Sequence, residues 1–198
     1  MRLIVGISGA SGVIYGIRLL EVLASQPQVE THLVISNGGK LNIALETGLG
    51  PKQVGRLASV VHSDLDLAAS IASGSFHTDG MIVAPCSMKA LSGIVNSYAD
   101  TLLVRAADVV LKERRRLVLV PRETPLHEGH CRLMHEASRM GAIIAPPMPA
   151  FYTAPQSVDD IVNHTVGRLL DLFGIDSGLV RRWQGARGRP RSAAKRPR

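Results

Sequence analysis

Short apolar runs alternate with longer amphipathic segments along most of this chain. Runs of four to six mainly apolar residues, as expected for strands buried on both faces, occupy 2–7, 31–35, 80–84, 117–120 and 142–145. Apolar residues recur at helical spacing in 13–25, 39–46, 66–73, 88–96, 100–114, 126–140 and 157–173. The alternation predicts a three-layer, Rossmann-like α/β domain, with a parallel sheet covered by helices on both faces.

The chain opens with a strand, a glycine-rich turn and an amphipathic helix. Gly6, Gly9 and Gly12 permit sharp turns, and a helix that starts after such a turn directs free N–H groups at a bound anion. Their spacing differs from the G-x-G-x-x-G dinucleotide fingerprint, and the second strand ends in Ser36-Asn37, without a carboxylate to hold a ribose hydroxyl. The turn therefore favours a phosphate monoester such as flavin mononucleotide (FMN) over a dinucleotide. An ordinary βα turn without a ligand is the alternative.

Polar residues follow the predicted strands at their carboxyl ends. Right-handed crossovers bring these ends to one edge of a parallel sheet, where such folds bind ligands. The residues expected at this edge are Ser36 and the segments 8–12, 85–89, 121–125 and 146–152. Three of these segments begin with proline, which ends strand pairing and restricts the turn. So many polar groups at one edge predict a ligand site there.

Length and composition predict one globular domain followed by a short tail. Of the 198 residues, 45% are apolar and 20% are charged. A chain of this length can form a single buried core. Eight of the 23 basic residues lie in 181–198, without an acidic residue, which leaves 15 basic against 16 acidic side chains in the rest of the chain. We therefore predict a domain at 1–185 and a disordered basic tail at 186–198. A solvated tail is favoured over one that binds nucleic acid non-specifically.

The cysteines and the hydropathy of the chain indicate the cellular compartment in which we expect the protein. Cys86 and Cys131 show no paired spacing, which argues against a disulfide framework and favours the cytoplasm. No apolar run approaches the length of a membrane span, and the N-terminus lacks the layout of a signal peptide.

Several reactive side chains lie at or near the predicted edge. Cys86 is a candidate nucleophile, but no companion base is visible, and a buried free thiol is the alternative. Ser87 begins another predicted helix, and Lys89 after it is either a contact for phosphate or flavin or a solvated helix residue. Arg122 and Glu123 place a cation beside a carboxylate suited to proton transfer, with a structural ion pair as the alternative.

The sequence gives little support for a metal site or for the catalytic triad of a hydrolase. His127, Cys131 and His135 share one face of a predicted helix, with a spacing that suits two metal ligands at a time. No carboxylate or third histidine completes a known motif, and the chain lacks the G-x-S-x-G elbow of serine hydrolases. We therefore expect neither a metal site nor a hydrolase triad.

Six segments spread over the chain together resemble the flavin prenyltransferases, the family of UbiX-type proteins. They are 9–20 (GASGVIYGIRLL), 45–47 (LET), 85–94 (PCSMKALSGI), 105–115 (RAADVVLKERR), 120–126 (VPRETPL) and 149–152 (PAFY). The resemblance runs in register from residue 2 to about residue 185. It implies a flavodoxin-like subunit that assembles into a dodecamer, with active sites where subunits meet.

The same resemblance implies a reaction. Members of the family join a dimethylallyl group from dimethylallyl phosphate to N5 and C6 of reduced FMN, and they require no metal. The product, prenylated FMN, serves a UbiD-type decarboxylase in ubiquinone synthesis or aromatic-acid breakdown.

Matched position by position, the resemblance also implies roles for individual residues. The residues implied to bind flavin are Gly9, Ala10, Ser11, Ser36, Ser87, Met88, Lys89, Ala90, Arg122 and Trp183, the last closing over the site. The residues implied to hold the prenyl phosphate are Lys112, Arg122, Tyr152 and Arg168. The residues implied in catalysis are Ser11, Glu46 and Glu123, with Glu123 favoured for proton transfer.

Two other functions stay open. One is an FMN-dependent decarboxylase of the cysteine-decarboxylase group, whose Pro-x-Met-Asn motif is replaced here by Pro-Pro-Met-Pro-Ala at 146–150, which argues against it. The other is a carrier that delivers FMN without chemistry.

Overall fold

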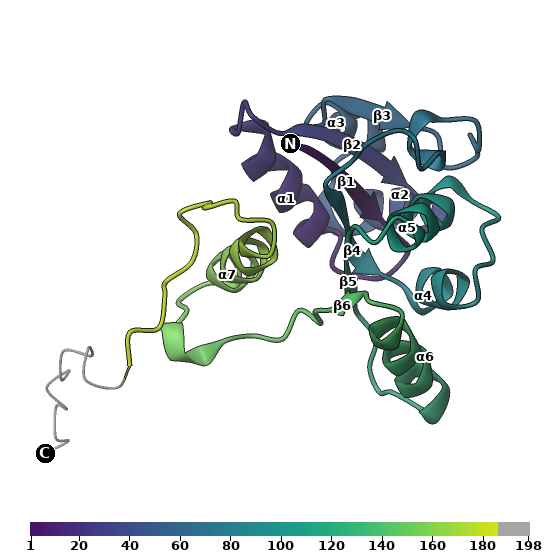
Figure 1. Ribbon diagram of the computed structural model, residues 1–198. Helices are drawn as coiled ribbons and strands as arrows, with labels where there is room; N and C mark the ends of the chain where they lie inside the picture. The colour runs from purple at the N-terminus through teal and green to yellow at the C-terminus, as the bar shows by residue number, and fades with distance from the viewer. Residues whose placement is uncertain (186–198) are drawn as a thin grey trace, which may run out of the picture.

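The fold is built on a single parallel sheet. In the computed structural model, which describes residues 1–185, six strands pair in the order β3-β2-β1-β4-β5-β6 (Figure 1). Their bounds are β1 (Arg2–Ile7), β2 (Glu30–Ile35), β3 (Val60–His62), β4 (Gly80–Cys86), β5 (Arg116–Pro121) and β6 (Ile143–Ile144). Neighbouring strands all run in the same direction, as the predicted crossovers require.

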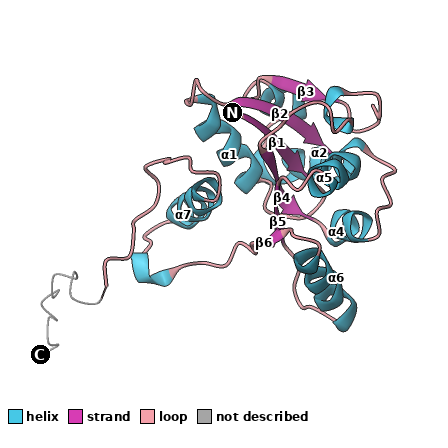
Figure 2. Cartoon of the chain, viewed as in Figure 1, coloured by secondary structure: helices cyan, strands magenta, loops and turns pink. Residues whose placement is uncertain are grey.

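Seven α-helices connect or follow the strands in the described part of the chain (Figure 2). They are α1 (Ile14–Ala24), α2 (Asn37–Thr47), α3 (Pro51–Gly55), α4 (Met88–Val95), α5 (Leu102–Lys112), α6 (Glu128–Arg139) and α7 (Val158–Asp171). Two short 3₁₀ turns, η1 (Ser70–Ala72) and η2 (Phe151–Thr153), complete the elements. Among residues 1–185, no helix has both the length and the apolar character that a membrane crossing needs.

Two apolar cores cover the two faces of the sheet, because side chains of a strand alternate between its faces. Leu3, Val5 and Ile7 of β1 belong to one core, which α1 and α7 cover, whereas Ile4 belongs to the other, which α4, α5 and α6 cover. The predicted three-layer α/β arrangement, flavodoxin-like and Rossmann-like, is therefore confirmed.

The strand order creates the crevice in which a ligand can bind. β1 lies between β2 and β4; the connection after β1 runs through α1 on one face of the sheet, whereas the connection after β4 runs through α4 and α5 on the other face. In such open sheets, ligands bind outside the carboxyl ends of the strands where the order reverses. This point lies at Ser8, directly after β1.

Five strands and six of the seven predicted helices are confirmed, and the errors lie in one region. The predicted helix at 66–73 is wrong: the segment contains only η1, and Asp66 Oδ1 accepts a hydrogen bond from the Ala68 N–H at 3.1 Å, a turn that competes with a helix. The strand β3 and the five-residue helix α3 were not predicted, because each is too short to show a period. The predicted tail at 186–198 lies outside the described residues.

Candidate functional site

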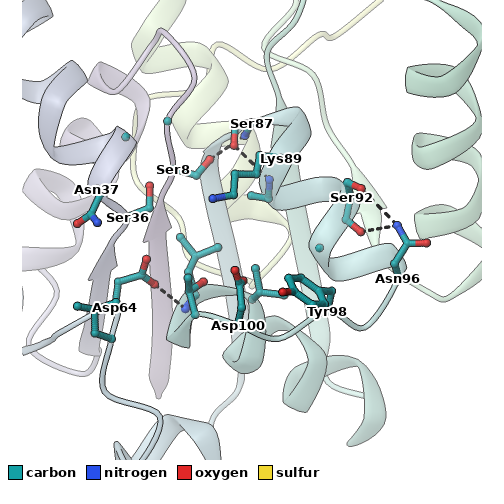
Figure 3. A pocket seen from close by; sticks show the side chains of 18 residues that line it. Ser8, Ser36, Asn37, Asp64, Ser87, Lys89, Ser92, Asn96, Tyr98 and Asp100 are labelled. Carbon is teal, nitrogen blue, oxygen red and sulfur yellow. Dashed lines mark hydrogen bonds between the residues drawn. The ribbon is translucent and has the colours of Figure 1, made fainter.

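A pocket of about 840 Å³ opens at the carboxyl ends of the central strands (Figure 3). Its lining includes five of the residues that the family resemblance assigns to flavin, namely Gly9, Ser36, Ser87, Lys89 and Ala90. They come from the ends of β1, β2 and β4 and from the start of α4. The predicted ligand-binding edge therefore has a pocket of the size that small-molecule ligands occupy.

The buried hydroxyl group of Ser8 holds the ends of β1 and β4 together at this pocket. The Ser8 hydroxyl, which is only 1% exposed, donates to the Pro85 carbonyl at 2.8 Å and accepts from the Ser87 N–H at 2.7 Å. A buried hydroxyl that satisfies both its donor and its acceptor locks the two segments in register. Ser8 thus positions the turn from which Ser87 begins α4.

Two helix N-termini point into the pocket. Ser36 caps α2 by accepting from the Gly39 N–H at 3.1 Å, and Ser87 caps α4 by accepting from the Ala90 N–H at 3.2 Å. The positive ends of both helix dipoles therefore lie at the same crevice. With the Lys89 side chain beside them, they favour a ligand with negative charge or with electron-rich oxygens.

Glycines allow the turns after β1 and β2 to touch backbone to backbone. A Cβ atom on Gly38 would lie 2.9 Å from the Gly9 Cα, and one on Gly39 would lie 2.5 Å from the Ile7 carbonyl oxygen. Larger residues at these positions would push the turns apart. Gly38 therefore lines the pocket with backbone alone, and Gly39 lets the turn after β2 approach the end of β1, because no side chain fits between the turns.

The start of α1 differs from the sequence-based expectation. The Gly12 and Val13 N–H groups donate to Glu46 Oε2 at 2.8 and 3.2 Å, so these two groups already have an anionic partner from α2. The expectation that they are free for a ligand is wrong. Glu46 serves α1 as a capping carboxylate supplied by another helix, a role that spacing along the sequence does not reveal.

Arg122 and Glu123 lie at the same edge but do not pair with each other in the described chain. Arg122 Nε donates to the Ser11 carbonyl at 3.0 Å, which ties the end of β5 to the turn after β1. Glu123 is exposed and accepts from the N–H of Thr124 at 3.0 Å. The alternative of a structural ion pair is thereby wrong, and the Glu123 carboxylate faces solvent beside the pocket edge.

Three further predicted site residues lie on a separate part of the chain. Tyr152 in η2 packs edge-to-face on Trp183, with ring centroids 5.6 Å apart, and Arg168 in α7 pairs with Asp171 at 2.7 Å. The segment from β6 to η2 extends away from the sheet, so η2 lies far from α2 and α4 (Figure 1). None of the three lines the pocket of their own chain.

Lys112 lies at the opposite edge of the sheet. It ends α5, which runs back from the ligand-binding edge, and it pairs there with Glu113. Four residues later β5 begins at Arg116, which pairs with Gly80 at the amino end of β4. Because a strand of this length spans roughly 20 Å, Lys112 cannot reach the pocket of its own chain.

The structure also places residues in the pocket lining that the sequence did not single out. Asp64 follows the unpredicted β3; it is 5% exposed, and its Oδ1 accepts from the Leu103 N–H at 2.9 Å. Tyr98 and Asp100 line the far side of the pocket, between α4 and α5. Recognition of β3 would have identified Asp64, since it occupies the carboxyl end of a strand.

Cys86 is a buried thiol. It is 0% exposed, and burial raises its pKa to about 12. Since the thiolate is the nucleophile, Cys86 does not act as one at neutral pH, and the alternative of a buried free thiol is confirmed.

Alkylation should distinguish the two cysteines. In the folded protein at pH 8, iodoacetamide is expected to leave Cys86 unmodified, because its pKa of about 12 keeps it a thiol and because reagent does not reach it. In the unfolded chain, both Cys86 and the exposed Cys131 should react. Peptide mass spectrometry measures both sites, and rapid modification of Cys86 in the folded protein would contradict the buried placement.

The histidine-rich helix shows no metal site. His127 Nδ1 caps α6 by accepting from the Gly129 N–H at 3.0 Å, and its ring lies 3.7 Å from that of His130. Within residues 1–185, no three side chains of the types that bind metals come together in a suitable group.

Sequence and structure comparisons agree with this arrangement. A profile of the Flavoprotein family matches residues 1–170. The chain is 60% identical over 187 residues to "Flavin prenyltransferase UbiX" of Escherichia coli (strain K12), in a match that covers 93% of this chain and 99% of that protein.

Two solved structures superpose closely on this chain. The dodecameric FMN-dependent UbiX-like decarboxylase from Escherichia coli O157:H7 has 57% identity and a TM-score of 0.92, with 93% and 100% of the chains covered. AnUbiX (PadA1) in complex with FMN and dimethylallyl pyrophosphate has 51% identity and a TM-score of 0.91, with 93% and 97% covered.

Proposed function

Because the chain belongs to the flavin prenyltransferase family, we propose that it joins a dimethylallyl group from dimethylallyl phosphate to N5 and C6 of reduced FMN. The observation that carries this proposal is the pocket where the turn after β1 meets the N-termini of α2 and α4. A related structure holds both FMN and a dimethylallyl pyrophosphate donor.

The pocket fits FMN by size and by chemistry. Its volume of about 840 Å³ suits a mononucleotide. Ser36 and Ser87 offer hydroxyl groups, the turn at Gly9 lets a ligand approach the backbone, and Lys89 adds a positive charge. The polar residue after β2 is Asn37 rather than an acid, which agrees with a ligand that lacks a second nucleotide. Bound FMN supplies the nucleophilic ring atoms of the reaction.

The residues proposed to grip the prenyl phosphate are three cations and a hydroxyl. Lys112, Arg122 and Arg168, with the Tyr152 hydroxyl, would surround the oxygen atoms that gain negative charge as the carbon–oxygen bond breaks. Trp183, which is 57% exposed in the single chain, would cover the site and exclude water from the developing allyl cation.

Glu123 is proposed to handle the protons of the second bond-forming step, in which the alkene of the prenyl group gains a proton and C6 of the ring loses one, with the released phosphate as a second acceptor. Its exposed carboxylate directly follows Arg122, which donates to the Ser11 carbonyl, so both side chains belong to the ligand-binding edge of the sheet. Ser11 and Glu46 are proposed to assist catalysis. For Glu46 the contact seen is structural, since it fixes the turn at Gly12.

We propose that the working site forms where subunits of an oligomer meet, with a dodecamer as the expected assembly. One chain leaves Lys112, Tyr152 and Arg168 away from the pocket and from the ligand-binding edge, where Arg122 contacts Ser11. Large apolar side chains are exposed on the segments that would meet, a pattern that marks interaction surfaces; they are Leu41, Leu45, Leu65, Tyr98, Met148, Phe151, Val158 and Trp183.

The remaining proposals concern the context of the reaction. The product, prenylated FMN, would pass to a UbiD-type decarboxylase in the cytoplasm, and the transfer would need no metal. No nucleic acid is expected as a partner.

Mass spectrometry of the flavin tests the proposed function. The protein is incubated without oxygen with reduced FMN and dimethylallyl phosphate, and in parallel with dimethylallyl pyrophosphate. A flavin heavier by one five-carbon unit is expected with the monophosphate. Unchanged flavin that is bound and still reduced would contradict the proposal and favour an FMN carrier. Release of carbon dioxide from a cysteine-like thiol substrate would instead favour the decarboxylase alternative.

A substitution tests the role of Glu123 within this reaction. Glu123→Gln keeps the size of the side chain but removes the base, so ring closure should slow by about 10²-fold or more. If both bond-forming steps kept their wild-type rates, the proton-transfer role of Glu123 would be wrong.

A further inference from the structure

We propose that His164 is a positioning residue, which donates a hydrogen bond from Nε2 to the Tyr152 hydroxyl oxygen and thereby directs the Tyr152 hydroxyl hydrogen at the phosphate of the prenyl donor. The inference rests on the proposed function, in which Tyr152 contacts that phosphate.

The geometry brings His164 and Tyr152 together across two elements. Tyr152 lies in η2 and His164 lies in α7, with Tyr152 Oη and His164 Nε2 3.4 Å apart. The rings meet edge-to-face, with centroids 5.6 Å apart and an interplanar angle of 85°. On its other side Tyr152 packs edge-to-face against Trp183. The phenol ring is thus held between two aromatic rings, while its hydroxyl faces the imidazole.

The burial of the second ring nitrogen decides which nitrogen holds the proton. His164 Nδ1 is buried and has no hydrogen-bond partner among the described residues. A buried N–H without an acceptor is costlier than a buried lone pair without a donor. In the neutral ring the proton therefore belongs on Nε2, where Tyr152 Oη accepts it.

Burial, and after it the charge of Arg168, favours the neutral form of His164. Desolvation lowers the pKa of His164, the positive charge of Arg168 lowers it further, and Asp171 opposes both. Asp171 is itself neutralised by ion pairs with Arg168 at 2.7 Å and with Arg182 at 2.9 Å. A neutral His164 can donate from Nε2 to Tyr152, and the positive charge proposed to face the phosphate on α7 is then that of Arg168.

The arrangement makes Tyr152 a stronger donor. When Oη accepts a hydrogen bond from His164, its own O–H becomes more polarised, and a chain of hydrogen bonds strengthens each member. Arg168 lies one helical turn after His164 on the same face of α7. His164 therefore orients the Tyr152 hydroxyl and lies next to Arg168. Both of these groups are proposed to hold the same phosphate.

Substitutions of His164 test the inference in the full-length oligomer. His164→Leu removes the donor while filling the space around the buried Nδ1, and His164→Gln restores an N–H donor near the position of Nε2. We expect Leu to lower kcat/KM for dimethylallyl phosphate by about tenfold, the effect of one lost hydrogen bond, and Gln to stay within about threefold of wild type. His135→Gln on the exposed face of α6 is the matched control.

A double-mutant cycle distinguishes positioning from a general structural effect. If His164 acts through Tyr152, His164→Leu should cause less than about twofold further loss in a Tyr152→Phe protein, because the hydroxyl that it orients is gone. The flavin affinity and the oligomer size of His164→Leu should match wild type. Independent, additive losses, or equal activity of the Leu variant and wild type, would overturn the inference.

Failure of the inference and failure of the proposed function give different results. A wild-type protein that never adds a five-carbon unit to FMN contradicts the proposed function itself. A wild-type protein that does so while His164→Leu is unaffected contradicts only the role of His164. If His164→Leu does not fold, His164→Met supplies the same loss of donor, and the prediction applies to it unchanged.

Discussion

Proteins with Lys112→Met and proteins with Glu123→Gln are each expected to lose about 10²-fold or more of prenyl transfer, yet regain activity when the two variants assemble together. Each variant lacks one group of the proposed site. Because Lys112 lies at the amino edge of the sheet and Glu123 at the carboxyl edge, the proposed site would take them from different chains. A mixed oligomer then contains sites in which both groups are intact.

The size of the recovery follows from the symmetry of the assembly. In oligomers formed at random from equal amounts of the two variants, about a quarter of the sites receive an intact Glu123 from one chain and an intact Lys112 from its neighbour. Co-expression with two purification tags isolates the mixed oligomers, and the mass of the flavin reports product. Mixing of separately assembled oligomers is the control, since they contain no such sites.

No recovery in verified mixed oligomers would show that Lys112 and Glu123 serve the same chain, or that one of them has no role. Recovery by a pair of variants on one edge, Arg122→Met with Glu123→Gln, would also contradict the arrangement. Both of these residues follow β5 and enter a site from the same chain.

Gly16→Ala is expected to destabilise the subunit by about 3 kcal/mol, the largest effect of any single methyl group that we predict. Gly16 lies on the face of α1 that packs against the sheet, and its added Cβ would overlap the Ala84 carbonyl oxygen and lie 2.7 Å from Ile7 Cγ1. The oxygen belongs to a strand in the middle of the sheet, so it cannot move aside without disturbing the strand pairing.

Thermal unfolding at fixed protein concentration measures this effect, and Tm should fall by roughly 6–12 °C. Gly55→Ala is the matched control, because Gly55 also lies in a helix but its Cβ would meet only Val61 Cγ2, at an ordinary 3.4 Å. The control should leave Tm unchanged or raise it slightly, as alanine favours a helix over glycine. An unchanged Tm for Gly16→Ala would mean that α1 lies farther from β4 than described.

The sequence predicted the sheet well because its strands are buried on both faces. Such strands are continuous apolar runs in the sequence and can be recognised without the tertiary structure. β1, β4 and β5 follow this rule over most of their length, and β2 follows it from Leu33 to Ile35. The edge strand β3 does not, because its Val61 is exposed and only three residues pair. Asp64 was therefore missed along with β3.

The pocket itself was also predictable, since a parallel sheet places every carboxyl end at one edge. Ser36 and Ser87 combine two local signals, a position after a strand and a cap of a helix, and both line the pocket. Individual contacts across the edge were not predictable. That Glu46 would occupy the N–H groups of Gly12 and Val13 depends on how α2 packs beside α1.

By itself, the sequence determined the α/β class, five of the six strands and the edge at which a ligand binds, because strand burial and turn chemistry act over a few neighbouring residues. Only the tertiary structure decided which groups meet at that edge. It gave the N-terminus of α1 a carboxylate from α2, and it placed Lys112 at the far edge and Tyr152 in η2, at the end of a segment that leads away from the sheet. The physical reason is that these contacts depend on how segments far apart in the sequence pack together, and a local sequence pattern does not contain this information.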